Sequence, residues 1–257
     1  MSLFGELFEE DDSGVNKMWG VTTGIVLQNW DEKQPGKVKV EMNLGTEGKN
    51  VSGWIPVMTP YGGKDYGMYT LPENGAFVIV AFLMGDRNRP VVMGSLWNQK
   101  NTIPADTAKD KNTVKRLRTK GGCEVIFQEE EKKEKIIVKT PGALQIQLDD
   151  EKKTISIGSG DGSNGLELDT DKGVLSVQAK SKIEFMVNGA PMITLDGNSK
   201  KTDIQSDMVC VNAKQSYKLK GQSVTVQGSM VKVKADSSLG LESGAMAQLK
   251  GSMVKIN

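Results

Sequence analysis

Apolar and polar residues alternate with a period of two along most of the chain, and this period predicts β-strands rather than helices. The segment 38–42 alternates strictly, and 76–82 is apolar enough for a central strand. Further strands are expected at 21–27, 53–57 and 91–94, between turns rich in Gly, Pro and Asp. About five strands in roughly 80 residues predict a small closed barrel such as an OB-fold.

From residue 119 onward an apolar-polar-apolar triplet recurs almost to the last residue. Near the end the triplets begin at 224, 231 and 239, and the hexapeptide 228–233 returns in nearly the same form at 251–256. A strand this short cannot bury its apolar face alone, so it must stack on copies of itself. Rungs of seven or eight residues are better closed by three chains, which favours an intertwined trimeric β-helix shaped as a triangular prism. We expect its core to contain Val224, Val226, Val231, Val233, Leu239 and Leu241.

These patterns divide the chain into four predicted parts. They are a flexible acidic segment at 1–17, an OB-fold domain at 18–98, a polar linker at 99–118 and a β-helix spike at 119–257. The four Trp residues all precede residue 100, and large aromatic side chains suit a globular core whereas their scarcity suits a narrow interior. The fold class is therefore all-β, with a compact N-terminal domain and a repetitive C-terminal one.

Composition excludes several kinds of function. The 257 residues carry 33 basic and 32 acidic side chains, so the net charge of +1 argues against a dedicated nucleic-acid or membrane-surface binder. Histidine is absent, which rules out His-dependent triads and His metal sites. The two cysteines form no disulfide framework, and the acidic N-terminus lacks the basic region of a secretory signal, so we expect synthesis in the cytoplasm.

The predicted barrel raises one alternative function. OB-folds bind oligonucleotides or sugars by stacking them on aromatic side chains, and Trp30, Trp54 and Tyr61 are the candidates for this role. The competing interpretation is that these rings pack the barrel core and its interfaces. The near-neutral charge favours the second interpretation, so we expect no nucleic-acid partner.

A second alternative is a tailspike-like β-helix enzyme that degrades surface polysaccharide. The paired acids Asp149 and Asp150 suit glycosidase chemistry in principle, but their charged surroundings favour a solvated hairpin tip. The loop at 161–165 lacks the spaced carboxylates of a calcium site and is interpreted as a turn, and the basic cluster at 115–118 as solvated linker. We therefore expect no enzymatic activity, no metal and no cofactor.

Several motifs resemble one known family. The segments 36–40, 53–57, 71–82 and 85–98 and the start of the repeats at 119–127 occur in the same order in the spike proteins of contractile injection machines. This group includes phage baseplate assembly protein V, the spike portion of the phage tail lysozyme and the valine-glycine-repeat spike of type VI secretion. The resemblance implies an OB barrel followed by a trimeric β-helix that punctures a target envelope when a sheath contracts.

The resemblance also implies partners and one departure. Fused hub domains are absent, so a separate baseplate hub protein is expected at the OB end. The iron-holding His-X-His apex of some phage spikes cannot form without histidine. The blunt apolar end of the repeats predicts a separate tip protein, similar to the PAAR-repeat caps of this family, and transient contact with the target envelope. We expect its contacts to be Met253, Val254 and Ile256.

Overall fold

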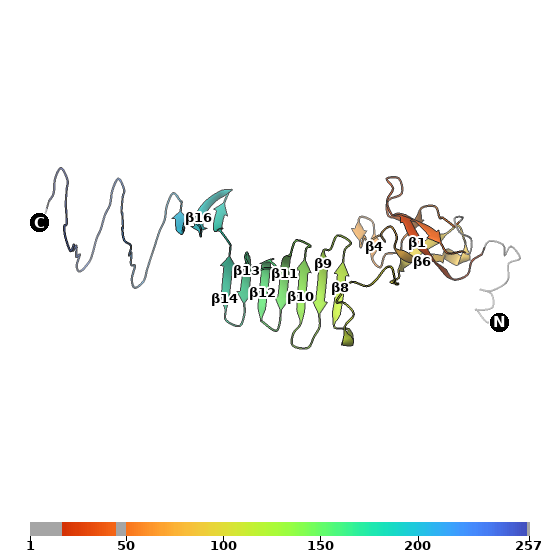
Figure 1. Cartoon of the computed structure of the whole chain (residues 1–257). Coiled ribbons are helices and arrows are strands. Elements are labelled where there is room, and N and C mark those ends of the chain that lie inside the picture. The colour runs from red at the N-terminus through yellow and green to blue at the C-terminus, as the bar shows by residue number, and fades with distance from the viewer. Residues whose placement is uncertain (1–16, 45–49, 256–257) are drawn as a thin grey trace, which may run out of the picture. The chain divides into compact units, whose positions relative to one another are not determined.

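The computed structural model describes residues 17–44 and 50–255, and its regular structure is almost entirely β (Figure 1). The described residues divide into two units, one within 17–184 and 194–202 and the other within 185–193 and 203–255. The helices of the described residues include two single 3₁₀ turns, Leu83–Gly85 and Asp110–Asn112. Within the described residues no helix is long and apolar enough to cross a membrane.

A five-stranded antiparallel sheet with the order β3-β2-β1-β6-β7 forms the N-terminal barrel. A parallel bridge between Val57 and Val92 connects the β3 side to β7 and nearly closes the sheet on itself. Gly24 in β1 allows the close approach of β2, because a Cβ there would come within 2.7 Å of the Glu41 carbonyl oxygen. The strands are β1 (Val21–Gln28), β2 (Lys37–Met42), β3 (Ile55–Pro56), β6 (Phe77–Phe82) and β7 (Pro90–Ser95), with the hairpin β4 (Gly62–Gly63) and β5 (Tyr66–Gly67) between β3 and β6.

The barrel core consists of β-branched aliphatic residues. Because side chains alternate across a strand, the inward positions of β1, β2, β6 and β7 fall on every second residue, as the sequence predicts. The expectation that the candidate aromatic rings pack the barrel core is wrong, because Trp30 and Tyr61 are exposed and Trp54 is half-buried, whereas their place at interfaces stays a prediction. Small side chains fill a narrow barrel without voids. The core cluster is Val26, Val38, Val40, Ile55, Val78, Val80 and Val92.

A seven-stranded antiparallel meander follows, in which each strand pairs with its neighbour in the chain. Its first strand lies inside the predicted linker, because Val114–Arg118 form β8. Its strands hold five or six residues and are joined as hairpins, so the short rungs expected from residue 119 onward do not describe this part. The remaining strands are β9 (Glu124–Gln128), β10 (Lys135–Lys139), β11 (Leu144–Asp149), β12 (Thr154–Ser159), β13 (Gly165–Asp169) and β14 (Val174–Gln178).

A small sheet of β15 (Lys182–Val187), β16 (Ala190–Asp196) and β17 (Lys201–Ile204) precedes the C-terminal tail, residues 205–257. Figure 1 draws the tail as a zigzag without strand arrows. Its bends are spaced seven or eight residues apart, which agrees with the repeat found in the sequence. The bends lie at 207, 214–215, 222, 229–230, 236–237, 244–245 and 252.

Candidate assembly interface

One face of the seven-stranded sheet carries apolar side chains on every strand, with Lys115 and Ser159 as its polar members. The strand register places these side chains on the same side, since directly opposed residues share a face: Val138 lies opposite Ile146, and Ile146 lies opposite Ile157. Most of these side chains are 36% to 60% exposed. We call this surface the apolar face. It comprises Leu117, Val125, Phe127, Ile136, Val138, Leu144, Ile146, Leu148, Ile155, Ile157, Leu166, Leu168, Leu175 and Val177.

An exposed apolar surface of this kind is expected to pack against another surface. Soluble monomers rarely expose contiguous apolar patches larger than a few hundred Å². Full burial of a Leu, Ile or Val side chain stabilises by about 2 kcal/mol, so covering the half that remains exposed is worth about 1 kcal/mol for each residue. Summed over the apolar face, this gain is on the order of 10 kcal/mol and is available only to an assembly.

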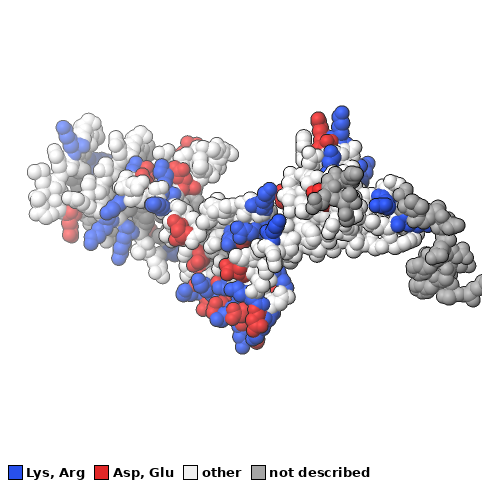
Figure 2. Space-filling view, turned by 45° about the vertical axis from the view of Figure 1, so that its right-hand side comes forward, with Lys and Arg blue, Asp and Glu red and all other residues white. Residues whose placement is uncertain are grey.

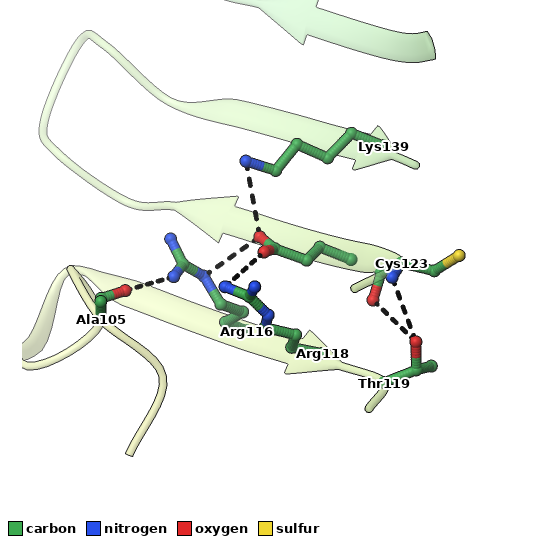
Figure 3. A network of polar contacts seen from close by, with 7 residues as sticks. Ala105, Arg116, Arg118, Thr119, Cys123 and Lys139 are labelled. Atoms are coloured by element: carbon green, nitrogen blue, oxygen red, sulfur yellow. Dashed lines mark hydrogen bonds and ion pairs between the residues drawn. The ribbon is translucent and has the colours of Figure 1, made fainter. Parts of the chain in front are cut away.

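The opposite face of the same sheet is polar apart from Val114, Ile126, Ile137 and Val174, and it holds a buried carboxylate. Glu124 in β9 is 5% exposed and lies among three cations from the neighbouring strands (Figure 3). Its Oε1 is 3.1 Å from Nη1 of Arg118, and its Oε2 is 3.6 Å from both Nε of Arg116 and Nζ of Lys139. Arg116 also donates a hydrogen bond to the carbonyl oxygen of Ala105, which ties the preceding linker to the sheet. The basic cluster at 115–118 is therefore part of a structural ion-pair network and not solvated linker.

A second buried carboxylate lies on the same polar face. Nζ of Lys135 in β10 is 2.9 Å from Oδ2 of Asp149 in β11, and the backbone N–H of Lys152 donates to Oδ1. Burial alone would raise the pKa of Asp149, but hydrogen bonds from Lys135 and Lys152 outweigh it, so the pKa lies below its ordinary value. The hydrogen bond to Asp149 raises the pKa of Lys135. Asp149 is thus a structural ion-pair partner, and the expectation of a solvated hairpin tip is wrong for it.

The tail presents apolar pairs that are exposed. Each segment between two bends contains one apolar-x-apolar triplet, and every residue from 205 to 255 is exposed. Within the described part of the tail, no backbone-to-backbone hydrogen bond forms after the one between Gln205 and Met192. The expected core residues Val224, Val226, Val231, Val233, Leu239 and Leu241 are therefore all accessible, and the phase of the bends adds pairs that the sequence reasoning missed, at 209 and 211, 217 and 219, and 247 and 249.

The expected tip contacts share this exposure. Met253 is 85% and Val254 is 47% exposed, whereas Ile256 lies outside the described residues. Their role at a tip stays a prediction. The two cysteines, Cys123 and Cys210, are free and exposed, and no cluster of His, Cys, Asp and Glu able to hold a metal ion occurs among the residues that the structure describes.

Polysaccharide hydrolysis and nucleic-acid binding, the two alternative functions, need sites that differ from the surfaces of this sheet and barrel. A hollow of about 400 Å³ lies on the polar face over β11 to β14, but its lining contains no aromatic ring and Glu167 as its one carboxylate. A polysaccharide hydrolase of the usual kind needs two carboxylates at its scissile bond. On the barrel, Tyr61 lies beside Tyr66 with ring centroids 5.4 Å apart, and Lys39 lies over Trp54. Tyr61 and Trp54 are thus each in contact with a neighbouring side chain.

Comparison with known protein families assigns the barrel to a class. Residues 22–97 match the family described as the type VI secretion system/phage-baseplate injector OB domain. The match runs from β1 to β7, so the predicted OB-fold is confirmed and resembles the injector OB domain.

Individual relatives carry the resemblance further. The chain is 36% identical over 94 residues to the type VI secretion system spike protein VgrG5 of Pseudomonas aeruginosa, a match that covers 35% of this chain and 12% of that protein. It is 29% identical over 154 residues to spike protein VgrG1a of the same organism (56% of this chain, 23% of the relative). The actin cross-linking toxin VgrG1 of Vibrio cholerae is 32% identical over 108 residues (39% and 10%). The resemblance to spike proteins is confirmed, and the chain spans less than a quarter of the length of these relatives.

Proposed function

We propose that this chain forms the homotrimeric central spike of a contractile tail or injection machine and punctures the target envelope when the sheath contracts. The observation that carries this proposal is the uncovered apolar face on a chain whose N-terminal barrel matches an injector OB domain. Three copies related by a three-fold axis cover one another's apolar faces without leaving a free one. A closed assembly of this kind follows from a heterologous contact whose rotation closes.

The proposed mechanism is mechanical. Three seven-stranded sheets form the sides of a triangular prism, with the apolar faces inside and the polar faces, including the Glu124 network, outside. In the tail, the unpaired segments of each chain hydrogen-bond to the segments of the other two, because an exposed strand edge is a template for pairing with another chain. Continuous pairing around a dry interior makes a rod stiff, and stiffness is the property a puncturing element requires.

The proposal includes two further partners. A baseplate hub protein binds the OB domain, and a PAAR-like tip protein covers Met253, Val254 and Ile256. The exposure of Met253 and Val254 supports the tip protein as a partner. The chain itself catalyses no reaction in this role, and it is made in the cytoplasm before assembly into the particle.

Two experiments test the proposal. Light scattering of the purified chain is expected to give three times the 27.9 kDa of one chain, and a stable monomer would disprove the trimer. In cells that carry the contractile machine, deletion of the chain is expected to stop delivery into target cells, and the intact chain should restore it. Restored delivery by a variant of the chain that cannot trimerise would refute the mechanical role.

A further inference from the structure

The charge of the chain is distributed unevenly between the tail and the rest. Residues 205–257 contain seven Lys, three acidic residues and no Arg, a net charge of +4, whereas the whole chain carries +1, which leaves −3 for residues 1–204. In Figure 2 the C-terminal part of the surface accordingly displays many blue side chains and few red ones. A tail with this excess attracts anionic surfaces even though the chain as a whole is nearly neutral.

The repeat places most of these lysines on one side of the tail. In an extended segment successive side chains alternate, so the middle residue of each triplet points away from the apolar pair. Lys218, Lys232 and Lys255 are such middle residues, and Lys220 and Lys234 follow two positions later on the same side. When the apolar pairs face the shared interior of the proposed trimer, these lysines face outward, and three tails together carry +12.

Methionines accompany the lysines on this outward side. Met208, Met230 and Met246 each stand two residues before the middle of a triplet, and they are 77% to 85% exposed. Lysine ammonium groups pair with phosphate, and long apolar side chains beside them enter the boundary between lipid headgroups and acyl chains. The tail has no Arg and one aromatic residue, Tyr217, which occupies an apolar-pair position. This combination fits a lipid surface better than nucleic acid, whose binders use Arg and aromatic stacking.

We infer that the outward side of the tail binds membranes rich in anionic phospholipid, with the lysines contacting the phosphates and the methionines contacting the interface below them. The orientation of the side chains rests on the proposed trimer. The inference goes beyond puncturing, because it gives the spike an affinity for the surface it crosses. It also predicts strong salt dependence, since contacts between exposed charges are screened within about 8 Å at physiological ionic strength.

The test is co-sedimentation of the full chain with vesicles. Vesicles of phosphatidylcholine alone are compared with an equal mixture of phosphatidylcholine and phosphatidylglycerol, at low and at physiological ionic strength. We expect binding to the anionic vesicles only, with a steep loss as salt rises. Replacement of Lys218, Lys220, Lys232 and Lys234 by Gln should weaken binding roughly tenfold or more, given the attraction of each lysine to an anionic leaflet.

A matched control variant tests whether the position of the removed lysine charges matters, and not only their number. Lys33, Lys64, Lys100 and Lys109 are exposed residues outside the tail, and their replacement by Gln removes the same charge. This control should bind as the unaltered chain does. The inference is overturned if both variants lose vesicle binding equally or if the chain binds neutral vesicles as well as anionic ones. Binding that does not depend on salt, or that is tighter to DNA than to vesicles, would also overturn it. Light scattering of the same samples reports the trimer separately, so a trimer that ignores anionic vesicles contradicts the inference and leaves the proposed function intact.

Discussion

A row of apolar residues across the centre of the seven-stranded sheet provides the sharpest test of the assembly. Ile146, Ile157 and Leu166 lie directly opposite one another on β11, β12 and β13, and they are 43%, 50% and 39% exposed. Replacing all three by Ala removes three carbon atoms from each side chain. At about 0.8 kcal/mol per buried carbon, scaled by the exposed fraction still to be covered, the loss is about 3 kcal/mol per chain and about 9 kcal/mol per trimer. The assembly constant should therefore fall by a factor on the order of 10⁶.

The matched control lies one residue away on the same strands. Gln147, Ser156 and Glu167 form the neighbouring row on the polar face, and their replacement by Ala should leave assembly nearly unchanged. Light scattering or mass photometry over a dilution series measures the monomer and trimer populations of both variants, and circular dichroism reports the strands. Dissociation of the polar-row variant at the same concentration as the apolar-row variant would refute the assignment of the interior face, and so would an apolar-row trimer that survives nanomolar dilution.

Three further predictions concern the tail and the buried ion pair. Val231→Asp should fray the tail or prevent assembly, because an unpaired buried charge costs several kcal/mol. Lys232→Asp should change the stability by about 0.5 kcal/mol or less per chain. Equal loss of stability for both variants in thermal melts would contradict the assignment of valine to the interior and lysine to the surface. Deletion of residues 251–257 should abolish binding of a PAAR-like tip protein and keep the trimer, and electron microscopy of intact particles without density beyond the spike end would exclude the cap. Because the pKa of Asp149 is lowered, its carboxylate stabilises the fold at pH values above the ordinary pKa of 3.8, and this stabilisation is lost as the pH falls through the pKa of the folded state. Asp149→Asn should therefore be less stable at pH 7, and denaturant titrations should show that its free energy of unfolding depends less on pH in the acid range.

The strands of the barrel could be predicted because each one leaves its own alternating pattern in the sequence. The expected segments 38–42 and 76–82 agree with β2 and β6 to within a residue at either end, since the buried Val residues recur at every second position. The hairpin of β4 and β5 has no such pattern, because Gly and exposed Tyr make up its strands. Local periodicity thus predicts strands that bury one face and misses those that bury neither.

The seven-stranded sheet was harder to predict because its charges pair between strands. β8 was interpreted as linker because its Lys and Arg residues suit solvent, yet Arg116 and Arg118 surround a carboxylate that lies on β9. Asp149 was assigned to solvent for the same reason, although Lys135, 14 positions earlier, is its partner. The two residues of a buried ion pair are far apart in the sequence. A local sequence pattern covers only one of them, so it does not reveal the pair.

The mode of strand pairing changes at Ile204, and this change bears on how the proposed spike assembles. Before it, β1 to β14 find their hydrogen-bonding partners within the chain, so the barrel and the meander can form in a single copy. After Gln205, the tail residues 206–255 form no backbone hydrogen bond within the chain, and fixing each residue costs roughly 1 to 2 kcal/mol of conformational entropy. For the proposed trimer, we therefore expect the three apolar faces to associate first. That association brings the starts of three tails together, and the regular bends let each added segment pair with its neighbours from residue 205 toward the C-terminal end.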